Sequence, residues 1–276
     1  MCRMTDRITV FGAAGYVGSA LVESLRRSGA DVIAVTRDTI AQTPADLGHA
    51  VYAIGLTSDF RSKPVETVQA HVVCLADLLS SKDFTSFTYL SSTRLYKSER
   101  TTDELTSIAA SSVDADGIYT LSKLLGEALT FRLAGDRGRV CRLSNVYGGN
   151  DRSSNFLTSI LADARSRRSV WIMQAPASTK DYIHIDDACR AIAAVAVQGM
   201  EPIYNVASGQ NTSHRQIADQ LGKAGVSVEF GSGPIVSFEP INVQRLRDLL
   251  DWKPRSLVDD LPGLLSTPDA IKEFST

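Results

Sequence analysis

This sequence of 276 residues is poor in the features that define several protein classes. Its four cysteines are scattered without a CxxC pair and its four histidines lack metal-pair spacing, so we expect neither a disulfide scaffold nor a bound metal. The longest unbroken apolar run, Ala191 to Val197, is far too short to cross a bilayer. The net charge of −2 gives no electrostatic reason to expect a nucleic-acid partner.

What is present is the composition of a folded protein. Hydrophobic residues make up 43% of the chain, enough for one large core or two modest domains. The first residues lead into a strand-like segment without the apolar stretch of a signal peptide. We therefore expect a cytoplasmic enzyme or binding domain without a membrane partner.

Short apolar runs alternate with segments of helical spacing through the first two thirds of the chain. In parallel sheets covered on both faces, the strands read as such runs and helices connect them. The pattern therefore predicts a doubly wound α/β fold with a parallel sheet of the Rossmann type. The predicted strands lie at 8–11, 32–35, 51–54, 87–90 and 140–143, and the predicted helices at 15–28, 65–79 and 119–133.

A turn with three glycines, Gly12, Gly15 and Gly18, joins the first predicted strand to the first predicted helix. Such a turn brings backbone N–H groups near a pyrophosphate at the positive end of the helix. We expect Gly12 to allow the tight turn, Gly15 the approach of a dinucleotide and Gly18 the packing of helix on strand. Turn geometry alone is the alternative explanation. The other cofactor contacts expected in this turn are Ala14, Tyr16 and Val17.

The end of the second predicted strand indicates which cofactor binds. An acidic residue there would bind the adenosine ribose of NAD, whereas this chain has Thr36 and Arg37. A hydroxyl followed by a guanidinium suits a 2′-phosphate, so we expect NADP(H) as the preferred cofactor and NAD as the possible one. In the alternative interpretation, Arg37 is a solvated surface residue and Asp38 binds the ribose.

The length of chain after this strand predicts a topological difference. Only 11 residues separate Arg37 from His49, too few for a helix, a third strand and a further connection. We expect the third βα unit to be reduced or absent, which would leave the adenine pocket more open.

The regular pattern loosens after residue 148, where Ser, Asn, Arg and Pro become common. We expect a dinucleotide-binding domain at 1–148, with 182–208 returning to it. The segments 149–181 and 209–276 would form a small C-terminal substrate lobe. Sequence does not fix the substrate, because specificity resides in the loops of such a lobe.

Tyr119 and Lys123 stand four residues apart in a predicted helix and therefore share one face. An ammonium can stabilise a tyrosinate or orient a ribose, and a Tyr with an ordinary pKa of about 10 needs such help near neutral pH. Ser91, Ser92 and Thr93 follow the fourth predicted strand, at the strand end where doubly wound folds bind ligands. These residues form a candidate catalytic group.

The order of these motifs resembles the extended short-chain dehydrogenases/reductases, and more narrowly the NAD-dependent epimerase/dehydratase family, which acts on nucleotide sugars. The resemblance spans roughly Ile8 to Pro254 and depends on the ordered set rather than on any one motif. The set consists of GxxGxxG at 12–18, SSTxLY at 91–96, YxxxK at 119–123, RLSNVYG at 142–148, KDYIHIDD at 180–187 and DWKP at 251–254.

The resemblance implies a role for each matching residue. Tyr119 would be the general acid/base at a sugar hydroxyl or ketone, Lys123 would hold the nicotinamide ribose and lower the Tyr119 pKa, and Ser92 would hydrogen-bond the reacting oxygen. Lys180 would pair with a phosphate of a nucleotide-diphosphate sugar, with a solvated surface charge as the alternative. The further contacts implied are Gly55, Leu56, Ser91 and Val146 for the cofactor, and Thr93, Asn145, Asn155 and Phe156 for the substrate.

Two positions depart from the family pattern. Dehydratases of the family carry an Asp-Glu pair directly after the catalytic hydroxyl, whereas this chain has Thr93 and Arg94, so dehydration is not expected. For Thr93 itself, packing at the strand end is the alternative to a substrate contact. A family Asn is His71 here, which either bridges backbone and cofactor or is a hydrogen-bonded core histidine.

The expected reaction is the NADPH-dependent reduction of a keto-sugar nucleotide, with Tyr119 as the general acid. The alternative functions are a nucleotide-sugar epimerase with tightly bound NAD and a non-catalytic NADP-binding regulator. The resemblance also implies a homodimer. The candidate contact residues are Val68, Val72, Leu75 and Leu79, unless they pack on the sheet.

Overall fold

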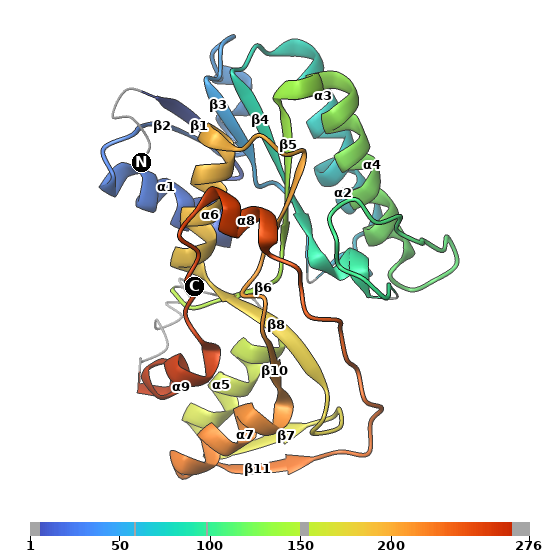
Figure 1. The fold of residues 1–276 in the computed structure, drawn as a ribbon, viewed down its shortest axis with the longest axis vertical. Coiled ribbons are helices and arrows are strands. Elements are labelled where there is room, and N and C mark those ends of the chain that lie inside the picture. The colour runs from blue at the N-terminus through green and yellow to red at the C-terminus, as the bar shows by residue number, and fades with distance from the viewer. Residues whose placement is uncertain (1–5, 58, 98, 150–154, 267–276) are drawn as a thin grey trace, which may run out of the picture.

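The computed structural model describes residues 6–57, 59–97, 99–149 and 155–266. A six-stranded, wholly parallel sheet with the order β2-β1-β3-β4-β5-β9 forms the upper half of the molecule in Figure 1. This sheet confirms the predicted doubly wound α/β class. Its strands are β1 (Arg7–Phe11), β2 (Asp31–Val35), β3 (His49–Tyr52), β4 (Ser86–Ser92), β5 (Gly138–Leu143) and β9 (Ile203–Val206).

Helices cover both faces of this sheet (Figure 1). On one face lie α1 (Tyr16–Arg27), α6 (Ile185–Gln198) and α8 (Gln244–Leu249), whose apolar sides share a core with β1 and β5. On the other face lie α2 (Pro64–Val68), α3 (Cys74–Ser81) and α4 (Gly117–Ala134). A π-helical segment, Gln69–Val73, joins α2 to α3, so the helix predicted from sequence at 65–79 has a bulge in its middle.

The third βα unit is absent, as the short spacing predicted. Strand β2 is the edge of the sheet, and a 3₁₀ turn at Ile40–Gln42 connects it to β3. Strand β3 then pairs with β1 on the side opposite β2. No further strand therefore lies beyond β2 in the part of the chain that the structure describes.

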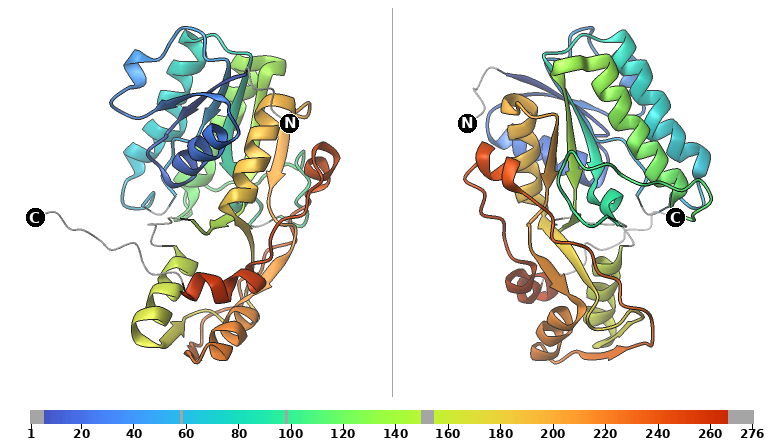
Figure 2. Two further views of the ribbon diagram at one scale, coloured as in Figure 1. Left: turned by 90° about the vertical axis from the view of Figure 1, so that its left-hand side faces the viewer. Right: turned by 45° about the vertical axis from the view of Figure 1, so that its right-hand side comes forward.

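A smaller lobe lies below the sheet in Figures 1 and 2. It has its own apolar core between its helices and two small groups of strands. Strands β6 (Asn145–Tyr147), β8 (Thr179–His184) and β10 (Asn211–Ser213) form one group, and β7 (Ser169–Ile172) with β11 (Ser227–Phe230) the other. The helices of the lobe are α5 (Phe156–Arg167), α7 (His214–Lys223) and α9 (Leu257–Ser266).

The packing of α2, α3 and α4 shows whether the predicted contact residues Leu75 and Leu79 face the sheet or the outside. Leu75 and Leu79 are buried in the core that faces the sheet, so they are packing residues and not dimer contacts. The exposed apolar side chains of this layer include Val65, Val73, Leu121 and Leu125. A helical period of 3.6 places these residues on the outer side, opposite the buried leucines.

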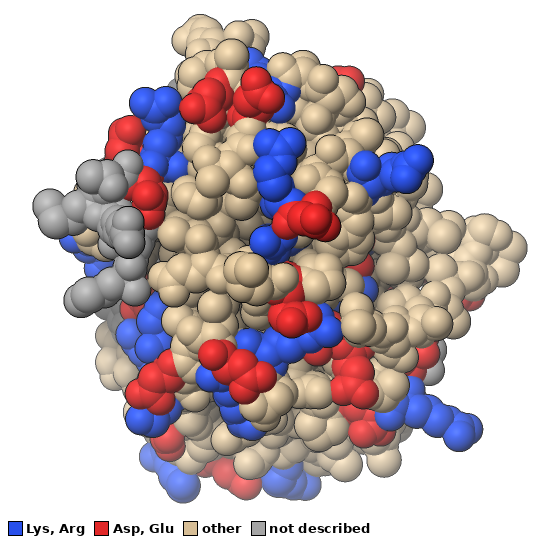
Figure 3. Space-filling view, turned by 45° about the horizontal axis from the view of Figure 1, so that its top comes forward, with Lys and Arg blue, Asp and Glu red and all other residues tan. Residues whose placement is uncertain are grey.

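The surface carries charges of both signs. On the face drawn in Figure 3, Lys and Arg lie interspersed with Asp and Glu, in keeping with the small net charge. Across the described ranges, none of the helices combines the length and apolarity that a bilayer span requires.

Candidate active site

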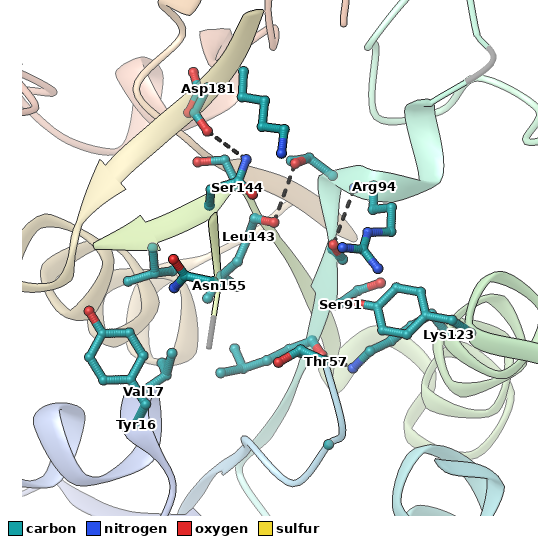
Figure 4. A pocket seen from close by; sticks show the side chains of 18 of the residues that line it. Tyr16, Val17, Thr57, Ser91, Arg94, Lys123, Leu143, Ser144, Asn155 and Asp181 are labelled. Carbon is teal, nitrogen blue, oxygen red and sulfur yellow. Dashed lines mark hydrogen bonds between the residues drawn. The ribbon is translucent and has the colours of Figure 1, made fainter. Parts of the chain in front are cut away.

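A cavity of about 520 Å³ lies between the sheet layer and the smaller lobe, at the carboxyl ends of the strands. This is the edge where doubly wound sheets bind ligands. Figure 4 shows Tyr16 and Val17 on one side of the cavity and Arg94 and Lys123 on the other. The residues predicted from sequence that line it are Gly15, Tyr16, Val17, Gly55, Ser91, Ser92, Thr93, Tyr119, Lys123, Asn145, Val146, Asn155, Phe156 and Lys180.

The remaining predicted cofactor residues lie outside this wall. They are Gly12, Ala14, Gly18, Thr36, Arg37 and Leu56. The first three belong to the glycine turn that leads into the cavity. The N–H of Leu56 donates to Nε2 of His71 at 3.2 Å and so is engaged within the chain.

The turn after β1 has the geometry that a dinucleotide phosphate needs. Gly12 has φ +81°, and a Cβ there would lie 2.9 Å from the backbone of Ala53. A Cβ on Gly18 would lie only 2.2 Å from the carbonyl oxygen of Gly12, so glycine alone allows α1 to start this close to β1. Helix α1 has no side-chain cap and no acidic residue in its first turn, which leaves its positive end open to an anion. These residues fit a nicotinamide dinucleotide.

Thr36 and Arg37 lie beside the same turn. The carbonyl of Val35, the residue before them, accepts hydrogen bonds from the N–H groups of Gly12 and Ala13 at 3.0 Å each. Thr36 is partly buried and bonds to Thr39, whereas Arg37 is exposed. Arg37 therefore presents an exposed guanidinium at the edge of the phosphate turn, on the side where the third βα unit is missing.

Tyr119 and Ser92 meet at the centre of the cavity wall. Tyr119 is only 2% exposed. Burial raises its pKa, while a hydrogen bond from Ser92 and the charge of Arg94 act in the opposite direction. The Ser92 hydroxyl also accepts a hydrogen bond from the N–H of Arg94 at 3.2 Å, which fixes its position at the start of the turn Thr93–Tyr96.

Lys123 lies one helical turn after Tyr119 and is equally buried. Its Nζ donates to the carbonyl of Leu90 at 2.8 Å and lies 4.8 Å from the centre of the Tyr89 ring. Burial lowers the pKa of Lys123 to about 7, and the charge of Glu127 opposes this shift. The ammonium is thus held against the end of β4, facing Gly55.

His71 is a hydrogen-bonded core histidine that also braces the site. Its Nε2 accepts the N–H of Leu56, so Nδ1 carries the proton and donates to Ser122 at 2.8 Å. Burial lowers the pKa of His71 to about 3, which keeps the ring neutral. The ring lies edge-on to Tyr119 at 5.6 Å, so the π-helical segment that carries His71 contacts both the loop at Leu56 and helix α4.

Ser91 is tied into a buried network behind the cavity. Its hydroxyl donates to Glu127 at 2.6 Å, and Glu127 receives a two-pronged pair of bonds from Arg142 at 3.0 and 2.7 Å. Arg142 also donates to the Tyr96 hydroxyl at 2.7 Å. The network locks β4, β5 and α4 together, which fixes the backbone that presents Ser92 and Tyr119.

The lobe supplies the opposite wall. The side-chain amide of Asn145 donates to the carbonyl of Asp181 at 2.8 Å, and Asn155 caps α5 by accepting the N–H of Thr158 at 3.0 Å. Phe156 stacks on His214 at 4.5 Å, and the Nζ of Lys180 lies 5.0 Å from the Phe156 ring. Burial and the charge of Arg94 lower the pKa of Lys180, so it is a cavity residue and not a solvated surface charge.

Several lining residues were not anticipated from the sequence. Phe60 and Arg61 come from the loop between β3 and α2, and Phe238 and Ile241 come from the long segment before α8. Phe60 is an isolated aromatic in a polar stretch, which is the one signal that could have drawn attention to that loop. It is 1% exposed and packs on Tyr119 at 4.9 Å.

Comparisons with known proteins show what the chain is similar to. The chain resembles the dTDP-4-dehydro-6-deoxy-D-allose reductase of a Streptomyces species (22% identity over 91% of this chain and 92% of the relative). It also resembles the dTDP-glucose 4,6-dehydratase of Streptomyces griseus (26% identity, 83% and 81% coverage). Among solved structures, MoeE5 in complex with UDP-glucose and NAD superposes with a TM-score of 0.77 at 20% identity, covering 94% of this chain and 97% of MoeE5.

Fold and cavity together define an NAD(P)-dependent enzyme of the extended short-chain dehydrogenase/reductase type. The model of the NAD dependent epimerase/dehydratase family matches residues 8–74 and 49–207. The chain belongs to this family, and its cofactor is a nicotinamide dinucleotide.

Proposed function

We propose that this enzyme reduces the keto group of a nucleotide-diphosphate sugar at the expense of NADPH. The observation that supports the proposal is which residues line the cavity around Tyr119. Ser92, Tyr119 and Lys123 gather there, while the two positions that hold acidic residues in the family's dehydratases are Thr93 and Arg94. Both relatives named above act on dTDP-sugars, which supports nucleotide-sugar modification as the class of activity.

Each residue of this group has a part in the reduction. A nicotinamide dinucleotide held at the glycine turn after β1 would supply the hydride for the carbonyl carbon. Ser92, fixed by the N–H of Arg94, donates a hydrogen bond to the carbonyl oxygen, and Tyr119 delivers a proton to it. Lys123, held on the carbonyl of Leu90, orients the ribose from the side of Gly55.

The described lining of this cavity does not offer the pair of acidic residues that dehydration of a sugar uses. Among the described residues that line it, Asp181 is the only one with a carboxylate. That carboxylate accepts the N–H groups of Ser208, Gly209 and Gln210 at 2.7 to 3.1 Å and the Ser208 hydroxyl at 2.8 Å. A carboxylate that accepts four hydrogen bonds from the chain anchors the β8 strand and is engaged within the fold.

The choice between reduction and epimerisation is tested by following the hydride. The enzyme is incubated with NADPH carrying deuterium at the transferred position and with a dTDP-4-keto-6-deoxy sugar. A reductase consumes NADPH in proportion to product and places deuterium on the sugar carbon. Interconversion of two sugars without net consumption of NADPH, by enzyme that retains NAD on purification, would contradict the proposal.

The preference for NADPH rests on Arg37. Replacing Arg37 by Ala should lower the ratio of kcat/KM for NADPH over NADH by about tenfold or more, because a charge-assisted bond to a 2′-phosphate is lost. Arg26→Ala, an exposed arginine in the last turn of α1, is the matched control. An unchanged ratio in Arg37→Ala would assign the adenosine ribose to another residue, such as Asp38.

We also propose that two copies associate through the outer side of α2 and α4. Val65, Val73, Leu121 and Leu125 are between 40% and 64% exposed there, an apolar surface that a second copy would cover. Sedimentation of the wild type and of Leu121→Glu/Leu125→Glu distinguishes a dimer from a monomer.

A further inference from the structure

We propose that Arg94 is a positioning residue for the acid/base chemistry of Tyr119: its guanidinium stabilises the phenolate while its backbone holds the Ser92 hydroxyl. The proposal rests on the role proposed above for Tyr119. It gives a function to the side chain that replaces an acidic residue of the dehydratases.

The guanidinium of Arg94 contacts two aromatic rings that also contact each other. Its guanidinium carbon lies 5.1 Å from the centre of the Tyr119 ring and 5.4 Å from the centre of the Phe60 ring. Phe60 and Tyr119 in turn contact each other at 4.9 Å. A planar cation that packs against two rings at once is restricted in position, and at this range it attracts an adjacent phenolate.

Among the residues that the structure describes, no acidic side chain pairs with Arg94. None of the ion pairs formed by the described residues includes Arg94, and its buried Nη1 has no hydrogen-bond partner among them. Arg61, from the neighbouring loop, differs because Asp116 pairs with it. The full charge of Arg94 therefore acts on the cavity and on Tyr119.

The other groups around Tyr119 contribute less positive charge. His71, edge-on to the ring, is neutral because burial lowers its pKa to about 3. Asp116, at the start of α4, raises the Tyr119 pKa, but Arg61 and Lys97 both pair with it. Tyr89 lies beneath and is also neutral, since burial raises its pKa well above the usual range.

Lys123, one helical turn from Tyr119, is a further cation of the cavity, and its charge depends on pH. Burial lowers its pKa to about 7, so near neutral pH a sizeable fraction of Lys123 is uncharged. An arginine stays protonated throughout the physiological range. The stacked Arg94 thus supplies a positive charge beside Tyr119 that does not vary with pH.

The test measures the ionisation of Tyr119 directly. The phenolate absorbance of the full-length protein is titrated, and the curve of the matching Tyr119→Phe variant is subtracted in each background. Arg94→Met should move the Tyr119 midpoint upward by about 1 to 3 pH units, the range for losing an opposite charge at such a distance. Arg94→Lys keeps the charge but not the planar group that packs on the rings. It should shift the Tyr119 midpoint less than Arg94→Met does.

Arg190→Met is the matched control, since Arg190 stacks on Trp252 at 5.3 Å on α6, away from the cavity. The control should leave the Tyr119 midpoint in place. A midpoint unchanged in Arg94→Met, in protein whose melting temperature and circular dichroism match the wild type, overturns the inference. A midpoint that also moves in Arg190→Met overturns it as well.

Turnover separates this inference from the proposed function. In the oxidative direction Tyr119 must be deprotonated, so Arg94→Met should shift the acid limb of the kcat profile to higher pH. A Tyr119 midpoint that moves in a protein with no activity on any keto-sugar supports the inference and contradicts the proposed function. Activity on a keto-sugar, together with an unchanged Tyr119 midpoint in Arg94→Met, supports the proposed function and contradicts the inference.

Discussion

The two walls of the cavity differ in how their polar groups are held. On the sheet side, Lys123 is bonded to Leu90 and Ser91 to Glu127, so the chain itself fixes these groups. On the lobe side, Lys180 lies over the Phe156 ring, and its charge faces the cavity. The sheet wall is thus preorganised for chemistry, whereas the lobe wall presents a group whose best partner is a ligand anion.

Because of this difference, substitutions in the two walls should have different effects on catalysis and on substrate binding. Changes on the sheet side should alter kcat or the stability of the fold, because the groups there are built into the core. Changes on the lobe side should alter KM, because in the proposed function the substrate engages the groups there in both ground and transition states. Four substitutions test the division.

Tyr119→Phe should have the largest effect. Removing the phenol hydroxyl takes away the proton donor, and kcat should fall by about 10²–10⁴-fold. The affinity for NADPH, followed by fluorescence titration, should change little because the ring remains. Retained turnover would remove Tyr119 from the reaction and would make the sheet wall a scaffold only.

Lys123→Met separates stability from activity in the same wall. Between its folded pKa of about 7 and its ordinary value of 10.5, the unfolded chain binds a proton at Lys123 that the folded chain does not. Stability of the wild type therefore rises with pH across this window, and the burial cost is fully present below it.

The Lys123→Met variant should accordingly be more stable than the wild type by on the order of 2–4 kcal/mol at pH 7, while its activity is lost. Denaturant unfolding between pH 7 and 10.5 measures the difference. The gain should shrink as the pH rises, and a gain that is constant with pH would point to packing instead of charge.

Gly18→Ala tests the turn that begins the sheet wall. The added Cβ would lie 2.2 Å from the Gly12 carbonyl oxygen, so backbone must move, at a cost of about 1–3 kcal/mol in the free energy of unfolding. Cofactor affinity should fall with it. Gly222→Ala is the matched control, because nothing lies within 4 Å of a Cβ in that part of α7. There the substitution should be neutral or stabilise the protein.

Lys180→Met should give the smallest effect and the one specific to the lobe wall. Loss of a charge-assisted bond to the substrate should raise KM for the nucleotide sugar by about tenfold, with kcat nearly unchanged. Lys223→Met, exposed at the end of α7, is the control. A fall in kcat without a change in KM would place Lys180 in the chemistry and would erase the contrast between the walls.

Local patterns in the sequence predicted much of the fold. Apolar runs located the strands, and the spacing from Arg37 to His49 predicted the missing βα unit, because chain length limits topology directly. The π-helical segment around His71 was not predictable, because it depends on the bonds of His71 to Leu56 and Ser122. Those bonds join residues far apart in sequence.

The cavity was predictable to a similar degree. Motif order located residues that the fold brings into one wall, since strand ends and helix faces follow from periodicity. The contacts among Phe60, Arg94 and Tyr119 join three separate segments, so no local sequence pattern indicates them. The burial of Leu75 and Leu79 likewise depended on which side of the helix meets the sheet.

If Arg37 selects the cofactor as proposed, the absent βα unit makes that choice sensitive to the solution around the protein. With β2 at the edge of the sheet, Arg37 stands in solvent beside the phosphate turn. An attraction between exposed charges is screened over about 10 Å at an ionic strength of 0.1 M and over about 3 Å at 1 M. Discrimination between the two dinucleotides should therefore decline steadily as salt is added, which would not happen if a further strand and helix enclosed that guanidinium.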